Sequence, residues 1–257
     1  MEKNLKIAAL PLDIAWTDRD ENLFAAANHI HSLPKDVDVI VLPELFTCGF
    51  VTDPALLAGL ADSAGSHPSL DAMRKMARAA NAAVCGTVPW CLEDGSFVNR
   101  CLFVEPDGET TVYDKHHLFT LGNEAKAFTA GAKEIPVVRF RGWNIAMAVC
   151  YDLRFPEWLR NRPARYDVLL VPANWPQARA YAWRQLLIAR AIENQAYVVG
   201  ANRSGKDDFG TYDNLTYIFD YLGMPVEAVP VSEPMAIVAT LSHTALDDAR
   251  RFFPVLS

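Results

Sequence analysis

The sequence predicts an α/β fold in which helices are layered on β-sheet. Two observations support this class: segments with helical periodicity alternate with short apolar runs, and several of these runs are almost continuously apolar. Continuous runs of this kind are typical of strands that are covered on both faces. The chain has 257 residues, about half of them hydrophobic, so we expect a single domain across residues 1–257.

The first predicted strand, 5–12, precedes a predicted helix at 18–33. Asp18 can cap this helix, and Glu21 follows three residues later, as in a capping box. Helical spacing places four apolar residues on the face that should be buried. They are Leu23, Phe24, Ala27 and Ile30.

The remaining elements continue the alternation, with turn sequences such as "EDGS" and "PDGE" between strands. Further helices are expected at 69–80, 155–162 and 178–195, and the last has the clearest helical spacing. Further strands are expected at 37–46, 82–90, 97–106, 109–119, 135–140, 143–150, 166–175, 196–203, 215–223, 226–230 and 235–241.

The composition argues against several functional classes. The net charge is −7 and Lys and Arg are not clustered, so we expect no nucleic-acid partner. No apolar run approaches the ~20 residues of a membrane span, so we expect no membrane association. Pro11 and Asp13 interrupt the first apolar run, which argues against a signal peptide and for a cytoplasmic protein.

The cysteines favour the same compartment. Their number is odd, their spacing shows no disulfide framework, and no C-x-x-C pair occurs. We therefore expect free thiols, mostly buried, and no zinc ribbon. The five are Cys48, Cys85, Cys91, Cys101 and Cys150.

One cysteine has unusual neighbours. In "IAMAVCYDLRFPEW", residues 145–158, an apolar run ends on Cys150 and a crowded polar segment follows at once. Cys150 could be a core residue beside a solvated turn. Alternatively, it could be a nucleophile at the end of a strand.

Two other reactive residues occupy similar positions. Glu44 follows the apolar run "VDVIVLP", and Lys115 follows "TTVYD". Alone, each could be a surface charge. Together with Cys150 they make chemical sense, because a carboxylate can deprotonate a thiol and an ammonium can hold an oxyanion. Sites in layered α/β folds form at strand ends, so one shared site is a reasonable expectation.

The blocks "VLPELF", "YDKHHLF" and "VCYDLRFPE" resemble the signature blocks of the nitrilase, or carbon–nitrogen hydrolase, superfamily. The resemblance covers most of residues 5–240. The block "PANWPQARAYAWRQLLIARAIENQ" looks most like the omega-amidase branch, which hydrolyses the side-chain amides of 2-oxoglutaramate and 2-oxosuccinamate. The resemblance implies a four-layer αββα sandwich, a homodimer or larger homo-oligomer, and no metal or organic cofactor.

Carried over by position, the resemblance makes Glu44, Lys115 and Cys150 the catalytic residues. Glu124 corresponds to a second family glutamate, which would orient Lys115 or contact substrate. Together with Lys115, the backbone N–H of Tyr151, just after the nucleophile, is expected to hold the oxyanion. The expected substrate is a small amide.

Arg154 is the candidate for gripping a substrate carboxylate, because a planar guanidinium suits that group. An internal ion pair with Asp152 or Glu157 is the alternative. Aromatic side chains near the motifs could form apolar walls of the pocket, or could belong to the core. These are Phe46, Tyr151 and Trp175.

The sequence departs from the family pattern near its end, at Asn214, Thr216 and Tyr221. None is a catalytic position, but the pocket wall and the substrate branch could change.

Other functions remain open at this stage. A Cys–His hydrolase would use His116 or His117 as the base, and Asp114 with these histidines could bind a metal. Within the superfamily, N-carbamoyl amino acid hydrolase, aliphatic amidase and nitrilase are alternatives. A non-catalytic binding protein on the same fold is another, because fold does not determine function.

Overall fold

The structure is a computed structural model that describes residues 4–131, 134–213, 215–231 and 236–256. Two β-sheets pack face to face within these ranges. The first has eight strands, in the order β14-β15-β1-β2-β4-β5-β6, with β3 paired to β4. Their bounds are β1 Asn4–Ala9, β2 Val39–Val41, β3 Asp62–Ser63, β4 Ala83–Cys91, β5 Phe97–Val104, β6 Thr110–Asp114, β14 Ala228–Val231 and β15 Ala236–Ser242.

The second sheet has five strands, in the order β13-β10-β9-β8-β7. Their bounds are β7 Val137–Phe140, β8 Trp143–Met147, β9 Val168–Ala173, β10 Tyr197–Asn202 and β13 Tyr217–Phe219. A small hairpin pairs β11 Lys206–Asp207 with β12 Gly210–Thr211.

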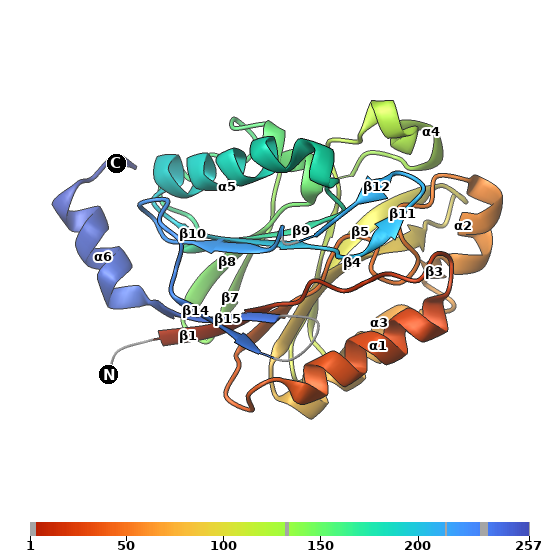
Figure 1. The fold of residues 1–257 in the computed structure, drawn as a ribbon, viewed down its shortest axis with the longest axis horizontal. Helices are drawn as coiled ribbons and strands as arrows, with labels where there is room; N and C mark the ends of the chain where they lie inside the picture. The colour runs from red at the N-terminus through yellow and green to blue at the C-terminus, as the bar shows by residue number, and fades with distance from the viewer. Residues whose placement is uncertain (1–3, 132–133, 214, 232–235, 257) are drawn as a thin grey trace.

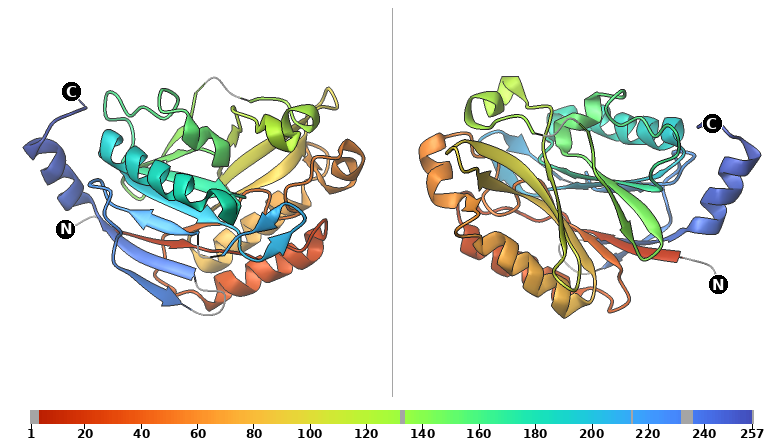
Figure 2. Two further views of the ribbon diagram at one scale, coloured as in Figure 1. Left: turned by 45° about the horizontal axis from the view of Figure 1, so that its top comes forward. Right: turned by 180° about the vertical axis from the view of Figure 1, so that it is seen from behind.

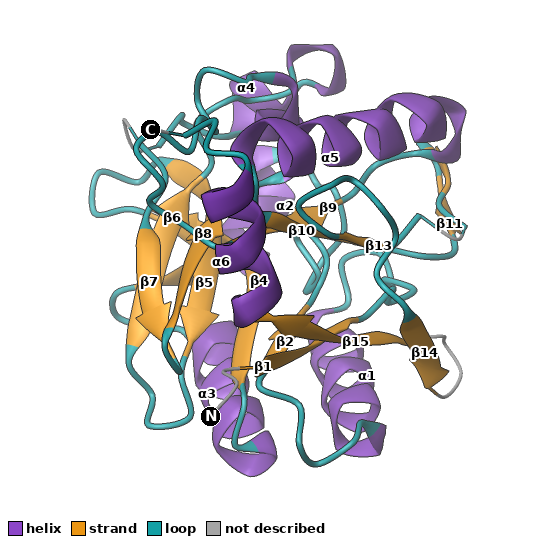
Figure 3. Cartoon of the chain, turned by 90° about the vertical axis from the view of Figure 1, so that its left-hand side faces the viewer, coloured by secondary structure: helices purple, strands orange, loops and turns teal. Residues whose placement is uncertain are grey.

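The helices complete a four-layer arrangement. Helices α1 and α3 cover the outer face of the first sheet, and α5 covers the second (Figures 1 and 2). Figure 3 views the molecule from the end where both termini lie, with α6 toward the viewer. The predicted αββα sandwich is confirmed. The bounds are α1 Arg19–Ser32, α2 Pro54–Leu60, α3 Pro68–Ala80, α4 Glu124–Ala127, α5 Ala180–Asn194 and α6 His243–Phe252, with 3-10 helices η1 Thr120–Gly122, η2 Cys150–Arg154 and η3 Gln177–Arg179.

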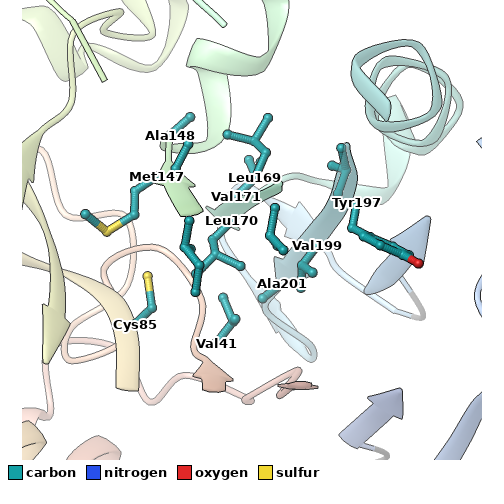
Figure 4. Packing of buried hydrophobic residues seen from close by; sticks show 14 of the residues in the cluster. Val41, Cys85, Met147, Ala148, Leu169, Leu170, Val171, Tyr197, Val199 and Ala201 are labelled. Carbon is teal, nitrogen blue, oxygen red and sulfur yellow. The ribbon is translucent and has the colours of Figure 1, made fainter. Parts of the chain in front are cut away.

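Alternation along the strands builds two separate cores. In β1, Leu5 and Ile7 belong to the core between the sheets, whereas Ala8 packs in the core beneath α1 and α3. Both faces are therefore buried, which explains the continuous apolar runs. Figure 4 shows the inter-sheet core, where Val41 and Cys85 of the first sheet approach strands of the second.

Helix α1 begins as predicted, and three of the four predicted apolar residues face the core, since Ile30 is buried and Leu23 and Ala27 pack against it. The Asp18 side chain accepts a hydrogen bond from the Glu21 N–H at 3.0 Å, which confirms the cap. Phe24, however, is 64% exposed. The helix instead buries Asn22, whose amide exchanges hydrogen bonds of 2.7 and 2.8 Å with the backbone of Ala15. Two good hydrogen bonds make burial of this polar side chain favourable, and they rotate the buried face.

Several boundaries differ from the prediction. The strand expected at 37–46 ends at Val41, and the one at 109–119 ends at Asp114. No helix forms at 155–162; a 3-10 turn, η2, begins at Cys150 instead. Helices α2 and α6 were not predicted. The segments 37–46 and 109–119 leave the sheet before their predicted ends, and Glu44 and Lys115 follow these points. Hydrophobic periodicity does not show where a strand leaves its sheet.

The sheet topology places the strand ends that carry the reactive residues together. Strands β1, β2 and β4 run parallel, and β6 returns to their direction through two antiparallel pairings. In the second sheet β8, β9 and β10 are parallel. The ends of β2 and β9 meet where the Glu44 N–H donates to the Ala173 carbonyl at 3.4 Å. In the part of the chain that the structure describes, no helix is both long and apolar enough to cross a bilayer.

Candidate active site

A buried charge network joins Glu44, Lys115 and Glu124, all fully inaccessible to solvent. The Lys115 Nζ donates to Glu44 Oε1 at 2.7 Å and to both Glu124 oxygens at 2.8 Å. Glu44 lies in the turn after β2, Lys115 directly follows β6, and Glu124 begins α4. Glu44 and Lys115, two of the residues that the strand-end argument grouped, therefore meet although they are 71 residues apart, and Glu124 joins them from nine residues after Lys115.

Asn99 of β5 extends this network, and sequence reasoning missed it. Its Nδ2 donates to Glu44 Oε1 at 2.9 Å and to Glu124 Oε1 at 3.1 Å. The other oxygen of Glu44 accepts the Asn174 N–H at 3.0 Å. The only signal in the sequence was an amide, next to Arg100, inside a mostly apolar strand. These donors fix the orientation of Glu44 and leave it little freedom to rotate.

Cys150 stands at the sharp turn between β8 and η2. Its φ of +43° lies in the left-handed region, which a residue with a side chain seldom adopts. The Asp152 carboxylate accepts the Val149 N–H at 3.0 Å and so supports the turn. Such strain at one residue is typical of sites where a side chain must be aimed. Here the turn places the thiol near Glu44, Lys115 and the Asn174 N–H, and each of these groups shifts the pKa of the thiol.

The environment sets the protonation of the three groups. Burial raises the pKa of the Glu44 carboxyl, and Lys115 only partly opposes this shift. Burial disfavours the Lys115 ammonium, but Glu124 and Glu44 outweigh burial and raise the pKa of Lys115. Burial, followed by the charge of Glu44, raises the pKa of the Cys150 thiol well above its usual range. The resting site therefore holds an ammonium and a neutral thiol beside a potential base.

A narrow pocket opens onto the thiol. Its volume is about 20 Å³, enough for one small group, and it adjoins a wider cavity of about 270 Å³. Four residues line both spaces, so they form one continuous path to Cys150: Phe50, Phe119, Asn174 and Arg179. The inner pocket is also lined by Lys115, Cys150, Tyr151, Arg154 and Trp175.

Arg154 lines the inner pocket, and the internal ion pair considered for it does not form with Asp152 or Glu157. Within the described residues Arg154 has no carboxylate partner; its guanidinium lies 5.0 Å from the centre of the Trp175 ring. The Asp152 carboxylate is occupied by other donors, and Glu157 is exposed. A free guanidinium in the pocket is available for a ligand.

The structure separates the aromatic residues that were expected to line the pocket. Trp175 and Tyr151 do line it. Phe46 lies elsewhere: it is fully buried in the core under α1 and α3, and the side chain of Phe50 lines the pocket instead. The chain turns sharply after β2, with Leu45 at a φ of +47°, and this turn directs Phe46 into the core.

Asp152 ties the two catalytic segments together, a role that the sequence did not reveal. Its Oδ1 accepts the His117 N–H and ring Nδ1, each at 2.9 Å. Its Oδ2 accepts the Tyr113 hydroxyl at 2.8 Å and the Val149 N–H at 3.0 Å. The strand end that bears Lys115 and the turn that bears Cys150 thus share one buried carboxylate.

The histidines do not support a Cys–His arrangement. His117 stacks on Phe155 at 3.6 Å, and His116 stacks on Trp158 at 3.9 Å. Neither histidine lines the pocket over Cys150. Asp114, the third residue of the conceivable metal site, forms a bidentate ion pair with Arg100 at 2.7 and 2.9 Å. Its carboxylate points to Arg100, so these three residues do not converge on a ligand.

Two of the three departures from the family pattern can be located. Thr216 is buried, and its hydroxyl exchanges hydrogen bonds of 3.2 Å with the backbone of Asn202. The Asn202 side chain holds the Trp175 backbone at 2.7 and 2.8 Å, so Thr216 supports the pocket wall indirectly. Tyr221 packs edge-on against Tyr197 and does not line the pocket. Asn214 lies outside the described residues.

Comparison with known proteins gives a consistent result. The family model "Carbon-nitrogen hydrolase" matches residues 6–251. Omega-amidase YafV of Yersinia enterocolitica is 42% identical over 254 residues, which cover 97% of this chain and 94% of the relative. 2-Oxoglutaramate amidase of Bacillus subtilis is 32% identical over 219 residues, covering 84% and 83%.

Solved structures agree. XC1258 from Xanthomonas campestris, a CN-hydrolase superfamily protein with an arsenic adduct in its active site, superposes with a TM-score of 0.90 at 35% identity, covering 98% of this chain and 96% of that one. Saccharomyces cerevisiae Nit3, of the nitrilase superfamily, shares the fold with a TM-score of 0.87 at 22% identity, covering 99% and 96%. The chain belongs to the carbon–nitrogen hydrolase family.

Proposed function

We propose that this protein is an omega-amidase that hydrolyses the terminal amide of 2-oxo dicarboxylic acid monoamides such as 2-oxoglutaramate and 2-oxosuccinamate. The observation that carries the proposal is the buried group of Glu44, Lys115 and Cys150 beneath a pocket whose wall holds Arg154, which has no carboxylate partner among the described residues. The site suits an amide at one end of the substrate and a carboxylate at the other. Relatives named omega-amidase and 2-oxoglutaramate amidase support the same substrate class.

The first half of the reaction forms a thioester. Cys150 Sγ attacks the amide carbonyl carbon while Glu44 takes the thiol proton, which is needed because the raised pKa keeps the thiol neutral. The Lys115 ammonium and the Tyr151 backbone N–H hold the resulting oxyanion. When the carbon–nitrogen bond breaks, Glu44 returns the proton to nitrogen and ammonia leaves.

The second half releases the acid. Water attacks the thioester carbonyl carbon, and Glu44 takes a proton from this water. The same groups hold the second oxyanion. The carbon–sulfur bond breaks, the sulfur regains its proton through Glu44, and the product carboxylic acid departs. Glu124 keeps Lys115 in place through its two hydrogen bonds of 2.8 Å.

The test is ammonia release by purified protein from 2-oxoglutaramate, compared with pentanamide, an N-carbamoyl amino acid and a nitrile, with Cys150→Ala as the control. We expect fast release from 2-oxoglutaramate only, and none from the variant. Faster release from another compound would move the protein to another branch of the family. If no compound releases ammonia, the result would favour a non-catalytic binding protein on this fold.

We further propose that the protein acts as a homodimer. Exposed apolar side chains gather where the end of α5, the turn after β13 and the end of α6 meet. Gln195 links two of these elements by donating to the Phe253 carbonyl at 2.8 Å, and a Cβ on Gly223 would touch Ile192. An apolar patch of this kind is typical of an interface. The patch consists of Ile192, Leu222, Met224, Phe252, Phe253 and Val255.

We also propose a cytoplasmic location for this single domain. All five cysteines are free, and Cys85 and Cys101 remain unbonded although their sulfurs lie only 3.7 Å apart. Such pairs are typical of a reducing compartment. Labelling of free thiols in protein purified without reductant tests this; a disulfide between the two would contradict it.

A further inference from the structure

Arg179 shares the environment of Arg154, although it comes from a different element. It is the last residue of η3 and lines both the inner pocket and the wider cavity. Its guanidinium lies 5.1 Å from the centre of the Phe119 ring, much as that of Arg154 lies 5.0 Å from the Trp175 ring. Ring stacking holds each guanidinium in place without using its hydrogen-bond donors.

The backbone at Arg179 is fixed. The Trp175 ring Nε1 donates to the Arg179 carbonyl at 3.0 Å, and helix α5 begins at the next residue. The same tryptophan therefore stacks on one arginine and anchors the other. This connection ties the backbone of Arg179 to the ring over which the Arg154 guanidinium lies.

Neither guanidinium has an ion-pair partner within the described residues, unlike the buried arginines Arg190 and Arg203. Arg190 pairs with Glu193 at 2.9 Å, and Arg203 pairs with Asp207 at 2.7 Å. Moreover, among the residues that the structure describes around the two cavities, none that lines them is Asp or Glu. Two positive charges thus face a path without a counter-charge, in a protein whose net charge is −7.

Asn174 supplies a third recognition element. The residue is 7% exposed and lines both cavities, yet its Oδ1 and Nδ2 have no hydrogen-bond partner in the described part of the chain. A buried amide without partners is costly unless a ligand or water completes its hydrogen bonds. The amide lines the inner pocket together with Cys150 and both arginines, where an uncharged polar group of a bound substrate could reach it.

We propose that Arg154 and Arg179 form a two-guanidinium clamp for the substrate carboxylate, and that the Asn174 side chain binds the 2-oxo group. The inference rests on the proposed omega-amidase function and deepens it. The clamp selects short amides that carry a carboxylate at the far end, since two guanidiniums can hold both carboxylate oxygens. The Asn174 amide then distinguishes a 2-oxo acid from the analogue without the oxo group, because the 2-oxo oxygen can accept a hydrogen bond from the Asn174 Nδ2.

The kinetic test compares kcat/KM for 2-oxoglutaramate with kcat/KM for pentanamide, a neutral amide of similar length. Arg179→Gln should lower the ratio of these two values by about 10- to 100-fold, because hydrogen bonds between charged groups are lost. Arg184→Gln is the matched control: it removes an exposed arginine of α5 that does not line the pocket, and should leave the ratio unchanged. An equal loss for both amides, or the same change in the control, would overturn the clamp.

A binding test without turnover separates this proposal from the proposed function. Calorimetry of 2-oxoglutaramate with Cys150→Ala should show about tenfold or more weaker binding when Arg179→Gln is added, and no such change with Arg184→Gln. Adding Asn174→Ala should weaken the binding of 2-oxoglutaramate more than the binding of glutaramate, which lacks the oxo group. Equal weakening of the binding of both compounds would overturn the role of Asn174.

The two proposals fail in different ways. If Cys150→Ala binds 2-oxoglutaramate through Arg179 but the wild type releases no ammonia from it, the proposed activity is wrong and the clamp stands. If the wild type hydrolyses 2-oxoglutaramate and Arg179→Gln changes neither the ratio nor the binding, the clamp is wrong and the activity stands.

Discussion

At the scale of single residues, the site combines a neutral thiol with a fixed carboxylate. Cys150 is not preformed as a thiolate, because burial and Glu44 together disfavour the negative charge. Nucleophilic attack therefore depends on proton transfer to Glu44. The buried group has one ammonium for two carboxylates, and this balance keeps Glu44 basic enough to accept the proton.

The first prediction concerns Glu44→Gln. This variant should lower kcat for amide hydrolysis by about 10³-fold or more, because a neutral amide cannot accept the thiol proton. Ammonia release measures the effect. Thermal unfolding provides the control, since glutamine retains the shape of the side chain and the variant should stay folded. Activity near that of the wild type would contradict the assignment of Glu44 as base.

The second prediction concerns pH. In the proposed mechanism the carboxylate form of Glu44 is the active form, and burial raises the pKa of this carboxyl. kcat/KM should therefore fall on acidification at a pH above the ~4.3 of an ordinary glutamate, since protonation begins earlier. A pH–rate profile of kcat/KM measures this. If the midpoint of the acidic limb lies at or below the ordinary glutamate pKa, another group controls the rate.

At the scale of elements, strand ends and the turns after them carry the chemistry, and buried polar side chains hold these turns together. Asp152 of η2 is joined to the end of β6 by three hydrogen bonds, from the Tyr113 hydroxyl and from the backbone and ring nitrogens of His117, and a fourth, from the Val149 N–H, closes its own turn. Because Lys115 and Cys150 belong to these two elements, the spacing between ammonium and thiol depends on this carboxylate.

The third prediction is that Asp152→Ala lowers both stability and kcat. Removing this acceptor leaves four buried or partly buried donors without their partner, at a cost of about 3 kcal/mol or more. A fall of about 6 °C or more in melting temperature is expected for a chain of this size. Asp114→Ala is the control, because that carboxylate also flanks Lys115 but, among the residues that the structure describes, bonds only Arg100. The control should retain most of its kcat; equal losses in both variants would contradict a linking role for Asp152.

The fourth prediction concerns the packing of α5 on the second sheet. A Cβ on Gly200 of β10 would lie 2.6 Å from Leu187 and 2.7 Å from Trp183. Gly200→Ala should therefore displace the helix and cost about 1–3 kcal/mol of stability. Gly59→Ala in α2 meets no atom within 4 Å and should be neutral or stabilising by up to about 1 kcal/mol. Denaturant unfolding of both variants checks this, and a neutral Gly200→Ala would refute the close contact.

At the scale of the whole molecule, the two outer faces differ. The face of α1 and α3 exposes Phe24, whereas the region around the ends of α5 and α6 exposes several apolar side chains, including Phe252 at 92%. A cluster of this kind is a better candidate for an interface than a single exposed side chain.

The fifth prediction tests the homodimer. Phe252→Glu should shift the protein from dimer to monomer in sedimentation or light scattering, because a buried carboxylate without a partner opposes association. Phe24→Glu on α1 makes the same chemical change on the other face and should leave the dimer intact. Dissociation by Phe24→Glu alone would place the interface on α1 and α3.

Much of the fold was predictable because its signals are local. The cap at Asp18 and the spacing in 178–195 depend on neighbours within one or two helical turns, and both predictions were confirmed. The αββα arrangement and the family were predictable from ordered motifs. Boundaries failed where a segment such as 37–46 leaves its sheet, since this depends on the contacts of the turn that follows.

The sequence by itself determined which chemistry this protein can perform, because Glu44, Lys115 and Cys150 each follow an apolar strand and parallel strands end at one edge. Only the tertiary structure decided which side chains surround that chemistry. It buried Phe46 and brought Asn99 between the two carboxylates. It also placed Arg179 in the pocket wall, with no ion-pair partner among the described residues. The physical reason is that burial and hydrogen-bond partners depend on residues far apart in sequence, which no local pattern records.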